Sequence, residues 1–224
     1  TTPADTSFDS SCTLCPRLVE FLAAGKQQYP QYHCAPVAPF GDPEARLLIV
    51  GLAPGFHGAN ATGRPFTGDY AGILLYETLY AFGLSTAPQS VAADDNLRLI
   101  GCRISNSVKC VPPGNKPLPA EIATCNRYLA HELAGVKEGT VLLALGAIAH
   151  GAVLRALGLK QSAFAFAHGN EHALPRKLTM VDSYHCSRYN TNTRRLTTEM
   201  FRTVVARAAQ RARGMSDYPL TPNP

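Results

Sequence analysis

The cysteines of this chain are the residues best suited to bind a metal. Cys12 and Cys15 form a C-x2-C pair, and Cys110 and Cys125 form a wider C-x14-C pair. Thiolates two residues apart on a turn can bind one metal centre, and a distant second pair can complete four ligands. Because the seven cysteines are odd in number and no secretion signal is seen, metal binding is favoured over a disulfide framework. Spacing alone leaves a [4Fe–4S] cluster and a zinc ion equally favoured, and both are favoured over free thiols.

Three further cysteines lie outside these pairs. Cys102 lies in an apolar run and is expected to be a small buried side chain. Cys34 is the spare candidate for a metal ligand, and Cys186 has no role assigned from the residues alone.

A glycine-rich stretch, "GLAPGFHGANATGRPFTGD" (51–69), directly follows the apolar run "ARLLIV". A phosphate site is the first interpretation of such a loop, but neither G-x-x-x-x-G-K-[ST] nor G-x-G-x-x-G occurs in it. Pro54 and Pro65 also remove amide donors that a phosphate would need. A mononucleotide site is therefore disfavoured. The side chains left for chemistry in this stretch are His57, Asn60, Arg64, Phe66, Thr67 and Asp69.

Arginines are concentrated near the C-terminus. Between Arg188 and Arg213 there are seven arginines, no lysine and one acid, Glu199, whereas the net charge of the whole chain is only +5. Such a segment could face phosphates, or it could be the solvated face of a helix. The two interpretations are equally favoured by this feature alone.

The strands and helices that must position these residues can be predicted from the sequence. It contains four apolar runs, each followed by a loop or a helix pattern. They predict buried strands at 46–52, 97–105, 140–146 and 176–185. Helical spacing predicts helices after Cys15 and at 71–82, 119–136, 147–158 and 196–214. The alternating segment 162–169 is expected to form a small hairpin with the residues after it. Buried strands that alternate with helices indicate an α/β fold with a mostly parallel sheet of four strands.

We expect residues 1–224 to form a single domain with flexible tails at about 1–11 and 215–224. No apolar run approaches the ~18 residues of a membrane span. We therefore expect a soluble cytoplasmic protein, with no membrane partner. In parallel sheets the ligand crevice lies at the carboxyl ends of the strands. Residues 51–69, 106–115 and 185–192 all follow predicted strands, so the fold should bring them together.

The motifs "GLAPG", "HGAN", "TGRPFTGD", "SNSVKCVPP" and "HCSRYNTNT", together with both cysteine pairs, resemble those of the family 5 uracil-DNA glycosylases. The resemblance spans about residues 12–196 in order. It implies a three-layer α/β/α domain, a [4Fe–4S] cluster on Cys12, Cys15, Cys110 and Cys125, and the removal of deaminated bases from DNA. The partner would be DNA that contains uracil, with hypoxanthine and xanthine as further candidate bases. No lysine in these motifs is placed to act as a Schiff-base nucleophile, so we expect a monofunctional glycosylase, and we expect it to be a nucleoid-associated monomer of prokaryotic type.

An enzyme of this kind flips the base out of the duplex and stabilises charge as the glycosidic bond breaks. The resemblance and the side-chain chemistry together assign three sets of residues. The catalytic candidates are Asp69, His185 and Asn190. The base-binding candidates are Ala53, Gly55, His57, Asn60, Phe66 and Asn106, with Phe66 as the stacking surface. The DNA-binding candidates are Ser187, Arg188, Arg194 and Arg195.

The chain departs from superfamily patterns at two positions. Leu52 stands where family 4 has Glu, a departure that family 5 shares, and Cys186 replaces the Pro of the usual H-P-S motif. Asp69 is the nearest acid and is predicted to orient water or stabilise the sugar cation. The alternative is a dissociative cleavage helped by the amides of residues 53–55, His57 and His185.

Two other classes of protein remain open from the sequence. One is a binding module, either an iron–sulfur DNA-binding protein or a relative that bonds covalently to uracil-DNA. No insertion of the kind carried by that covalent branch occurs between Gly68 and Ala71. The other is a nucleic-acid-binding domain held together by zinc.

Overall fold

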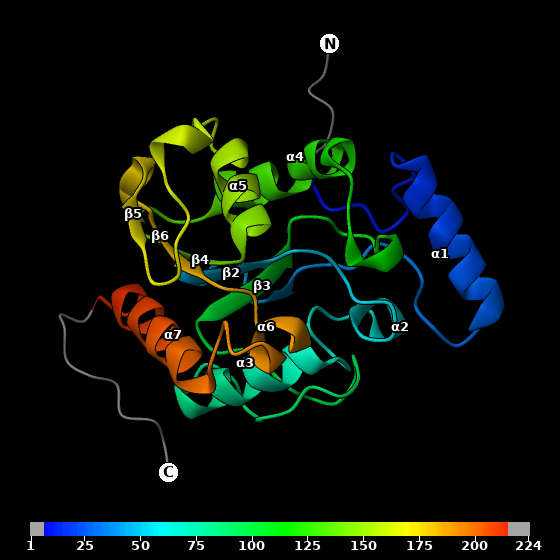
Figure 1. The fold of residues 1–224 in the computed structure, drawn as a ribbon, viewed down its shortest axis with the longest axis horizontal. Coiled ribbons are helices and arrows are strands. Elements are labelled where there is room, and N and C mark those ends of the chain that lie inside the picture. Colours follow the sequence, from blue (N-terminus) through cyan, green and yellow to red (C-terminus); the bar gives the residue numbers. More distant parts are fainter. Residues whose placement is uncertain (1–6, 215–224) are drawn as a thin grey trace.

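The computed structural model describes residues 7–214. They form one six-stranded sheet with helices around it (Figure 1). The strands stand in the order β1-β3-β2-β4-β6-β5. The four central strands are parallel, and the two short edge strands are antiparallel to their neighbours. Their bounds are β1 (Phe40–Gly41), β2 (Leu47–Gly51), β3 (Cys102–Asn106), β4 (Val141–Leu145), β5 (Glu171–Ala173) and β6 (Thr179–Ser183).

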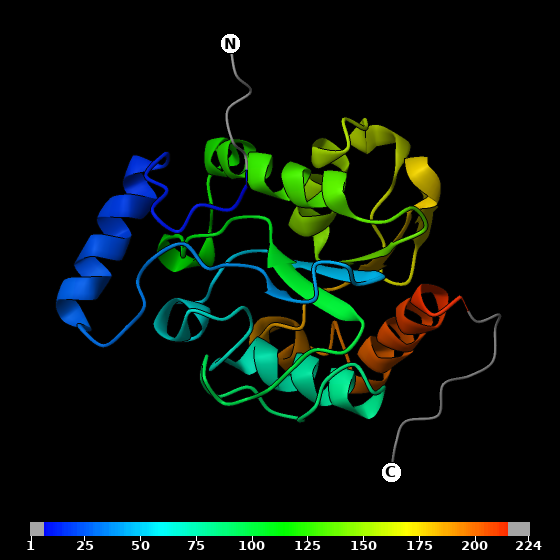
Figure 2. The same ribbon diagram turned by 180° about the vertical axis from the view of Figure 1, so that it is seen from behind.

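Helices cover both faces of this sheet, which gives the expected three layers (Figure 1). Helices α3 and α7 share a core with one face, and α4 and α5 share a core with the other. Helix α1 stands beside the sheet in both ribbon views (Figure 2). The helix bounds are α1 (Pro16–Gln28), α2 (Ala59–Thr62), α3 (Tyr70–Ala81), α4 (Pro119–Gly135), α5 (Ala147–Ala156), α6 (Arg188–Asn192) and α7 (Thr198–Ala212).

The alternation of side chains along β2 explains why its whole run is apolar. Leu47 and Ile49 pack into the core on the side of α3 and α7, whereas Leu48 and Val50 pack against α4 and α5. Every residue of the strand is buried. A strand covered on both faces has no polar side to present, so its sequence is a continuous apolar run.

The four predicted strands are confirmed as the parallel core, but the sheet has six strands rather than four because β1 and β5 extend its edges. The predicted strand 97–105 is shorter, since Gly101 turns the chain at φ 63° and β3 begins at Cys102. The predicted strand 176–185 begins later, because Arg176 has φ 60° within a 3-10 turn and β6 starts at Thr179. Neither positive φ is compatible with extended strand geometry.

The hairpin expected from the alternation at 162–169 lies elsewhere. Residues Gln161–Ala163 form a 3-10 turn, and the hairpin consists of β5 and β6. Two short helices were not predicted. Helix α2 lies inside the glycine-rich stretch, and α6 lies in the segment that follows β6.

The predicted N-terminal tail is partly ordered in the structure. Phe8 makes an edge contact with Tyr128, with ring centroids 6.3 Å apart, and the Ser11 amide donates to Asp9. The remainder of the two predicted tails, 1–6 and 215–224, lies outside the described residues. Over residues 7–214, no helix has the length and apolar character needed to cross a membrane.

Candidate active site

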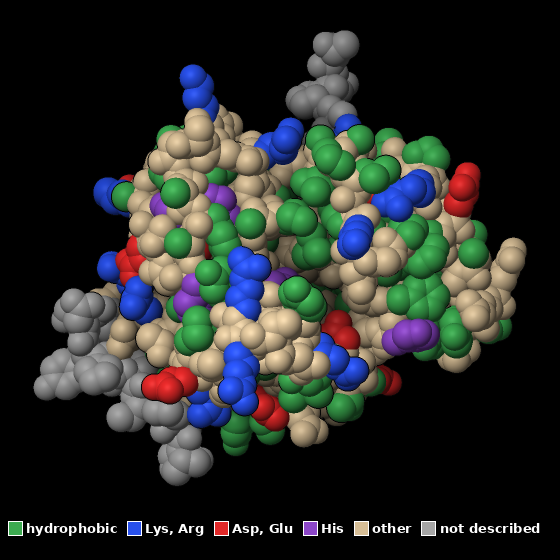
Figure 3. Space-filling model, viewed as in Figure 1, with side chains coloured by type: hydrophobic (Ala, Val, Ile, Leu, Met, Phe, Trp, Pro, Cys, Tyr) green, Lys and Arg blue, Asp and Glu red, His purple; other side chains and the backbone are tan. Residues whose placement is uncertain are grey.

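A cavity of about 740 Å³ opens at the edge of the sheet where the parallel strands end. The segments after β2, β4 and β6 supply most of its lining, and Asn115, which follows β3, adds to it. Figure 3 shows this face hollowed near its centre, with Lys or Arg side chains beside the hollow. The structure thus brings together the three segments that the sequence placed at strand ends. It adds a fourth, residues 145–148, which follows β4 and obeys the same rule.

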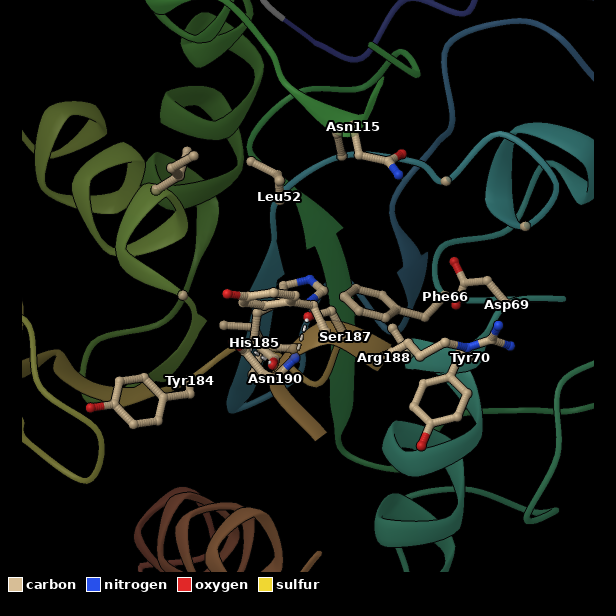
Figure 4. A pocket seen from close by; sticks show the side chains of 18 of the residues that line it. Leu52, Phe66, Asp69, Tyr70, Asn115, Tyr184, His185, Ser187, Arg188 and Asn190 are labelled. Carbon is tan, nitrogen blue, oxygen red and sulfur yellow. Dashed lines mark hydrogen bonds between the residues drawn. The ribbon is translucent and has the colours of Figure 1, made fainter. Parts of the chain in front are cut away.

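Phe66 forms one wall of the cavity, and its ring lies nearly parallel to that of His185 (Figure 4). The ring centroids are 5.9 Å apart and the planes differ by 25°. Gly51 makes room for this arrangement, because a Cβ there would lie 2.6 Å from the Phe66 ring and 2.5 Å from Asn106 Oδ1. This glycine therefore serves close packing around an aromatic side chain.

Asp69 projects into the cavity from the start of α3, where its two carboxylate oxygens have different surroundings. Oδ1 accepts a hydrogen bond from the Gly72 amide at 2.9 Å and caps the helix. Oδ2 faces Gly55 and Gly58, and a Cβ on Gly58 would come within 2.6 Å of it. Burial raises the pKa of Asp69, although backbone hydrogen bonds oppose part of the shift. One oxygen therefore holds the carboxylate in place while the other faces the cavity wall.

His185 follows β6 and lines the cavity opposite Phe66. The Asn190 side chain donates from Nδ2 to the His185 carbonyl at 2.8 Å, which fixes the chain just after the strand (Figure 4). Burial lowers the pKa of His185 to about 4, because a charged imidazole would lose solvation there. At neutral pH the ring is uncharged and still carries one N–H donor.

We expect the ring resonances of His185 to stay constant from pH 8 to about pH 5 and to titrate near pH 4, because burial lowers its pKa. The measurement is a pH series of heteronuclear NMR spectra, with the signal assigned through its absence in His185→Gln. A midpoint near ~6.5, the ordinary value for histidine, would contradict the burial argument.

Helix α6 brings basic and aromatic side chains to the mouth of the cavity. Ser187 caps the helix by accepting from the Asn190 amide. The Arg188 guanidinium lies over the ring of Tyr70 at 5.0 Å, and that of Arg195 lies over Tyr184 at 4.6 Å. Ser187, Arg188 and Arg195 line the cavity.

Arg194 does not line this cavity. It lines a neighbouring surface groove together with Ile73 and Leu196. It is exposed to solvent.

The arginine-rich segment divides into two parts in the structure. Arg207 and Arg211 both pair with Glu171, and Arg213 donates to the Phe82 carbonyl. These side chains of α7 and its C-terminal end have partners within the protein, and those of Arg207 and Arg211 form ion pairs at the solvated surface. Of the two interpretations left open by the sequence, the phosphate-facing one fits the α6 end of the segment and not the α7 end.

Comparisons with known proteins agree with this geometry. A family model described as the uracil DNA glycosylase superfamily matches residues 38–209. A type-5 uracil-DNA glycosylase of Thermus thermophilus is 48% identical, over 91% of this chain and 94% of its own. The type-5 enzymes of Pyrobaculum aerophilum and Mycobacterium bovis are each 42% identical, over 89% and 85% of this chain and 88% and 74% of theirs. The chain belongs to the type-5 uracil-DNA glycosylases.

The base-binding candidates of this type-5 uracil-DNA glycosylase fall into two groups. Ala53, Gly55 and His57 line the cavity with Phe66. Asn60 does not: it is fully buried and donates to the Phe56 carbonyl at 3.3 Å within its own turn.

Asn106 is also absent from the cavity lining, but it lies directly behind it. Its Oδ1 atom is close to Gly51, beside Phe66, and it is buried without a hydrogen-bond partner. Buried acceptors without a donor are uncommon in folded proteins, and Asn60 Oδ1 is another example in this chain.

The two departures from superfamily patterns have clear places in the type-5 enzyme. Leu52 lines the cavity, so an apolar side chain occupies the position at which family 4 has an acid. Cys186 is fully buried, and its thiol donates to the Ala71 carbonyl at 3.4 Å. The cysteine thus ties the segment after β6 to the first turn of α3.

Sequence reasoning missed the aromatic side chains that line the far side of the cavity. Phe166 and Tyr184 lie there with Ile148. Tyr189 also lines the cavity, and it is 73% exposed on α6. A large exposed aromatic beside an arginine is a signal that the sequence "SRYN" already contained.

The two cysteine pairs converge beside α1. Cys12, Cys15, Cys110 and Cys125 line one small apolar pocket, together with Leu18 and Val108. The same apolar cluster continues to Ala53 and Phe56 in the wall of the active-site cavity. Burial raises the pKa of Cys110 to about 12 and that of Cys125 to about 11. Both therefore stay protonated at neutral pH unless a metal replaces the proton.

Proposed function

We propose that this protein flips uracil out of DNA and hydrolyses the bond between the base and deoxyribose, leaving an abasic site. The observation that carries the proposal is the pair of facing rings, Phe66 and His185, with the Asp69 carboxylate beside them at the strand ends. Membership of the type-5 family supports the same activity. The proposal treats the chain as one domain, which its single sheet supports, and as a monomer.

Recognition of the base rests on stacking and on one buried acceptor. A flat base that enters the cavity can stack on the part of the Phe66 ring that lines it. The unpartnered Oδ1 of Asn106 can accept a hydrogen bond from an N–H on the base edge. Uracil offers such an N–H between its two carbonyl groups.

Bond cleavage requires stabilisation of two developing charges. As the C1′–N bond breaks, its electron pair stays on the base and the sugar acquires oxocarbenium character. The neutral His185 ring can donate its N–H to the departing base oxygen, and Asn190 holds the segment that carries it. The Asp69 carboxylate can stabilise the sugar cation and orient the water that adds to C1′. The proton released by that water passes to solvent or to Asp69.

Hydrolysis without a covalent amine intermediate fits the lining of the site. Among the described residues that line the cavity, none is a lysine. Lys109 is buried elsewhere and donates to Glu132 at 2.6 Å. This supports a monofunctional glycosylase.

Purine substrates are a finer part of the proposal. A cavity of about 740 Å³ falls in the range that holds drug-sized ligands. Leu52, Ile148 and Phe166 make much of its wall apolar and add few polar restrictions around a base. We therefore include hypoxanthine and xanthine among the expected substrates.

The direct test uses duplex oligonucleotides that hold a single uracil, hypoxanthine or xanthine. Incubation with the protein is followed by alkaline cleavage at abasic sites and separation by length. We expect cleavage at uracil, and we expect cleavage at hypoxanthine and xanthine as well. Tight binding without abasic sites would instead identify the binding-module alternative and overturn the assignment.

DNA binding by the α6 end of the arginine segment should depend steeply on salt. We expect Arg195→Ala to weaken binding on all sequences and to reduce the slope of log Kd against log salt by about 1, because one phosphate contact is lost. Fluorescence anisotropy over a salt series measures this. Arg211→Ala is the matched control, because its guanidinium pairs with Glu171 at 2.6 Å. Binding that ignores salt, or equal slopes in both variants, would contradict the assignment.

We infer that the four converging cysteines hold a [4Fe–4S] cluster. Tetrahedral zinc on four thiolates would place the sulfur atoms about 3.8 Å apart. Within residues 7–214, however, the only three His, Cys, Asp or Glu groups with ligand atoms within 4.8 Å of one another are His150, His172 and Asp182. The thiols are therefore more widely separated than one ion requires. Bound there, the cluster would supply a structural link between the N-terminal segment and residues 110–125.

A further inference from the structure

Phe66 is held in a backbone conformation that aromatic residues rarely adopt. Its φ is 55°, in the left-handed region, although it lies between Pro65 and Thr67 rather than beside a glycine. A bulky residue in this region persists only when the surrounding structure holds it there. The contacts on either side of Phe66 therefore decide how its ring is presented.

The contact before Phe66 is a buried arginine that reaches across to a distant segment. The Arg64 guanidinium donates from one nitrogen to Asp95 at 2.5 Å and to Ser90 at 2.9 Å. Its other terminal nitrogen donates to the Ala93 carbonyl at 2.5 Å. The guanidinium also lies 4.4 Å from the centre of the Phe40 ring, and Arg64 is only 5% exposed.

The distant segment is itself pre-shaped to receive this arginine. The Asp95 carboxylate accepts from the backbone amides of Val91, Ala92 and Leu97. Burial alone would raise its pKa, but the hydrogen bonds from Arg64 and these amides outweigh it and hold the pKa at about 2. Asp95 is thus a fixed anion at the centre of a closed turn.

The contacts after and around Phe66 complete the hold. Thr67 and Ser90 share a hydrogen bond at 2.7 Å between their hydroxyl groups. The Tyr76 hydroxyl donates to the Pro65 carbonyl at 2.9 Å from the middle of α3. Residues 64, 65 and 67 are each anchored, and Phe66 is the residue left to point into the cavity.

We propose that Arg64, Ser90 and Asp95 act as positioning residues that fix the Phe66 ring as the stacking surface for the flipped base. This inference rests on the proposed function and deepens it. None of the three side chains lines the cavity, so their effect on the reaction passes through Phe66. Arginine suits this role because its planar fork aims fixed donors from two terminal nitrogens at these three acceptors, whereas a lysine presents all its donors from a single nitrogen.

A double-mutant cycle tests whether the effect passes through Phe66. Single-turnover uracil excision is measured for wild type, Arg64→Lys, Phe66→Ala and the double variant. We expect Arg64→Lys to slow excision about tenfold in the wild-type background and less than twofold in the Phe66→Ala background, because coupled residues are not additive. The affinity of Arg64→Lys for undamaged duplex DNA should differ less than twofold from that of wild type. A full tenfold loss in both backgrounds, or no loss in either, would overturn the proposal.

A second measurement does not depend on activity or on the folding of the arginine variant. We expect Asp95→Asn to increase amide hydrogen exchange in peptides covering residues 64–69. Asp94→Asn is the matched control, since the neighbouring Asp94 is exposed and makes no such contact with Arg64. Unchanged exchange in Asp95→Asn would overturn the proposal. If wild type excised no uracil, the proposed function would fail, while this exchange experiment would still test the hold on Phe66.

Discussion

Replacing Asp69 with Asn should slow uracil excision by about 100-fold or more in single-turnover assays, with little loss of stability. The carboxylate is the acidic group that lines the cavity, and in the proposed mechanism its negative charge stabilises the positive charge that develops on the sugar. Asn keeps the size of the side chain and is a good N-cap, so the hydrogen bond to Gly72 that begins α3 can persist. The loss should therefore appear in the single-turnover rate constant of excision rather than in the thermal unfolding midpoint.

The pH profile gives the same prediction a second readout. Because burial raises the pKa of Asp69, the active carboxylate is lost on acidification at a higher pH than an ordinary Asp would require. Wild type should lose rate as pH falls through that raised pKa, and Asp69→Asn should lose this acid limb. Asp94→Asn serves as the exposed control. A full rate in Asp69→Asn would instead support dissociative cleavage helped by the amides of residues 53–55, His57 and His185.

Replacing Cys125 with Ser should remove the iron and lower the thermal unfolding midpoint by about 10 °C or more. Purified wild type should contain about four irons per chain and absorb broadly near ~400 nm. The proposed cluster would link the segment before α1 to residues 110–125, and losing such a link would remove metal-binding free energy from the folded state alone. Elemental analysis, absorbance and a melting curve measure the three quantities.

Two variants sharpen the cluster experiment. Cys34→Ser should keep the iron, because Cys34 lies outside the pocket that the four cysteines line and instead accepts from Asn60 Nδ2 at 3.5 Å. Cys110→Ser should behave like Cys125→Ser. Colourless wild-type protein with one zinc per chain would contradict the cluster and return the zinc alternative. Iron lost from Cys34→Ser would show that the ligand set was assigned wrongly.

The central sheet could be predicted because each parallel strand is buried on both faces. Continuous apolar runs such as 47–50 and 141–145 have few other interpretations between helix patterns. Phe66, Asp69 and His185 followed from them, since all three lie in segments that leave strand ends. The edge strands β1 and β5 could not be found in this way. They are two and three residues long, and they exist only because β3 and β6 offer them partners.

Side-chain roles were harder to predict than positions. Asn60 stands in a polar loop beside the site, yet its amide serves its own turn. Arg207 and Arg211 look like phosphate ligands until Glu171, which belongs to the edge strand β5, is seen to pair with both. Arg64, by contrast, has a structural role that its motif did not reveal. Its buried contacts lie in residues 90–95, a segment with no motif of its own. The roles of the three arginines depend on partners distant in sequence, which the local sequence does not reveal.

The crowding at Gly51 and Gly58 limits how this enzyme can be redesigned. A single added methyl group at either position would collide with Phe66 and Asn106, or with Asp69. Residues larger than glycine are therefore not tolerated at these two positions of the cavity wall. Ile148, by contrast, is 43% exposed on the opposite side, where Phe166 and Tyr184 also border the cavity. Directed evolution toward larger damaged bases should therefore randomise this opposite side and leave the glycine-rich loop as it is.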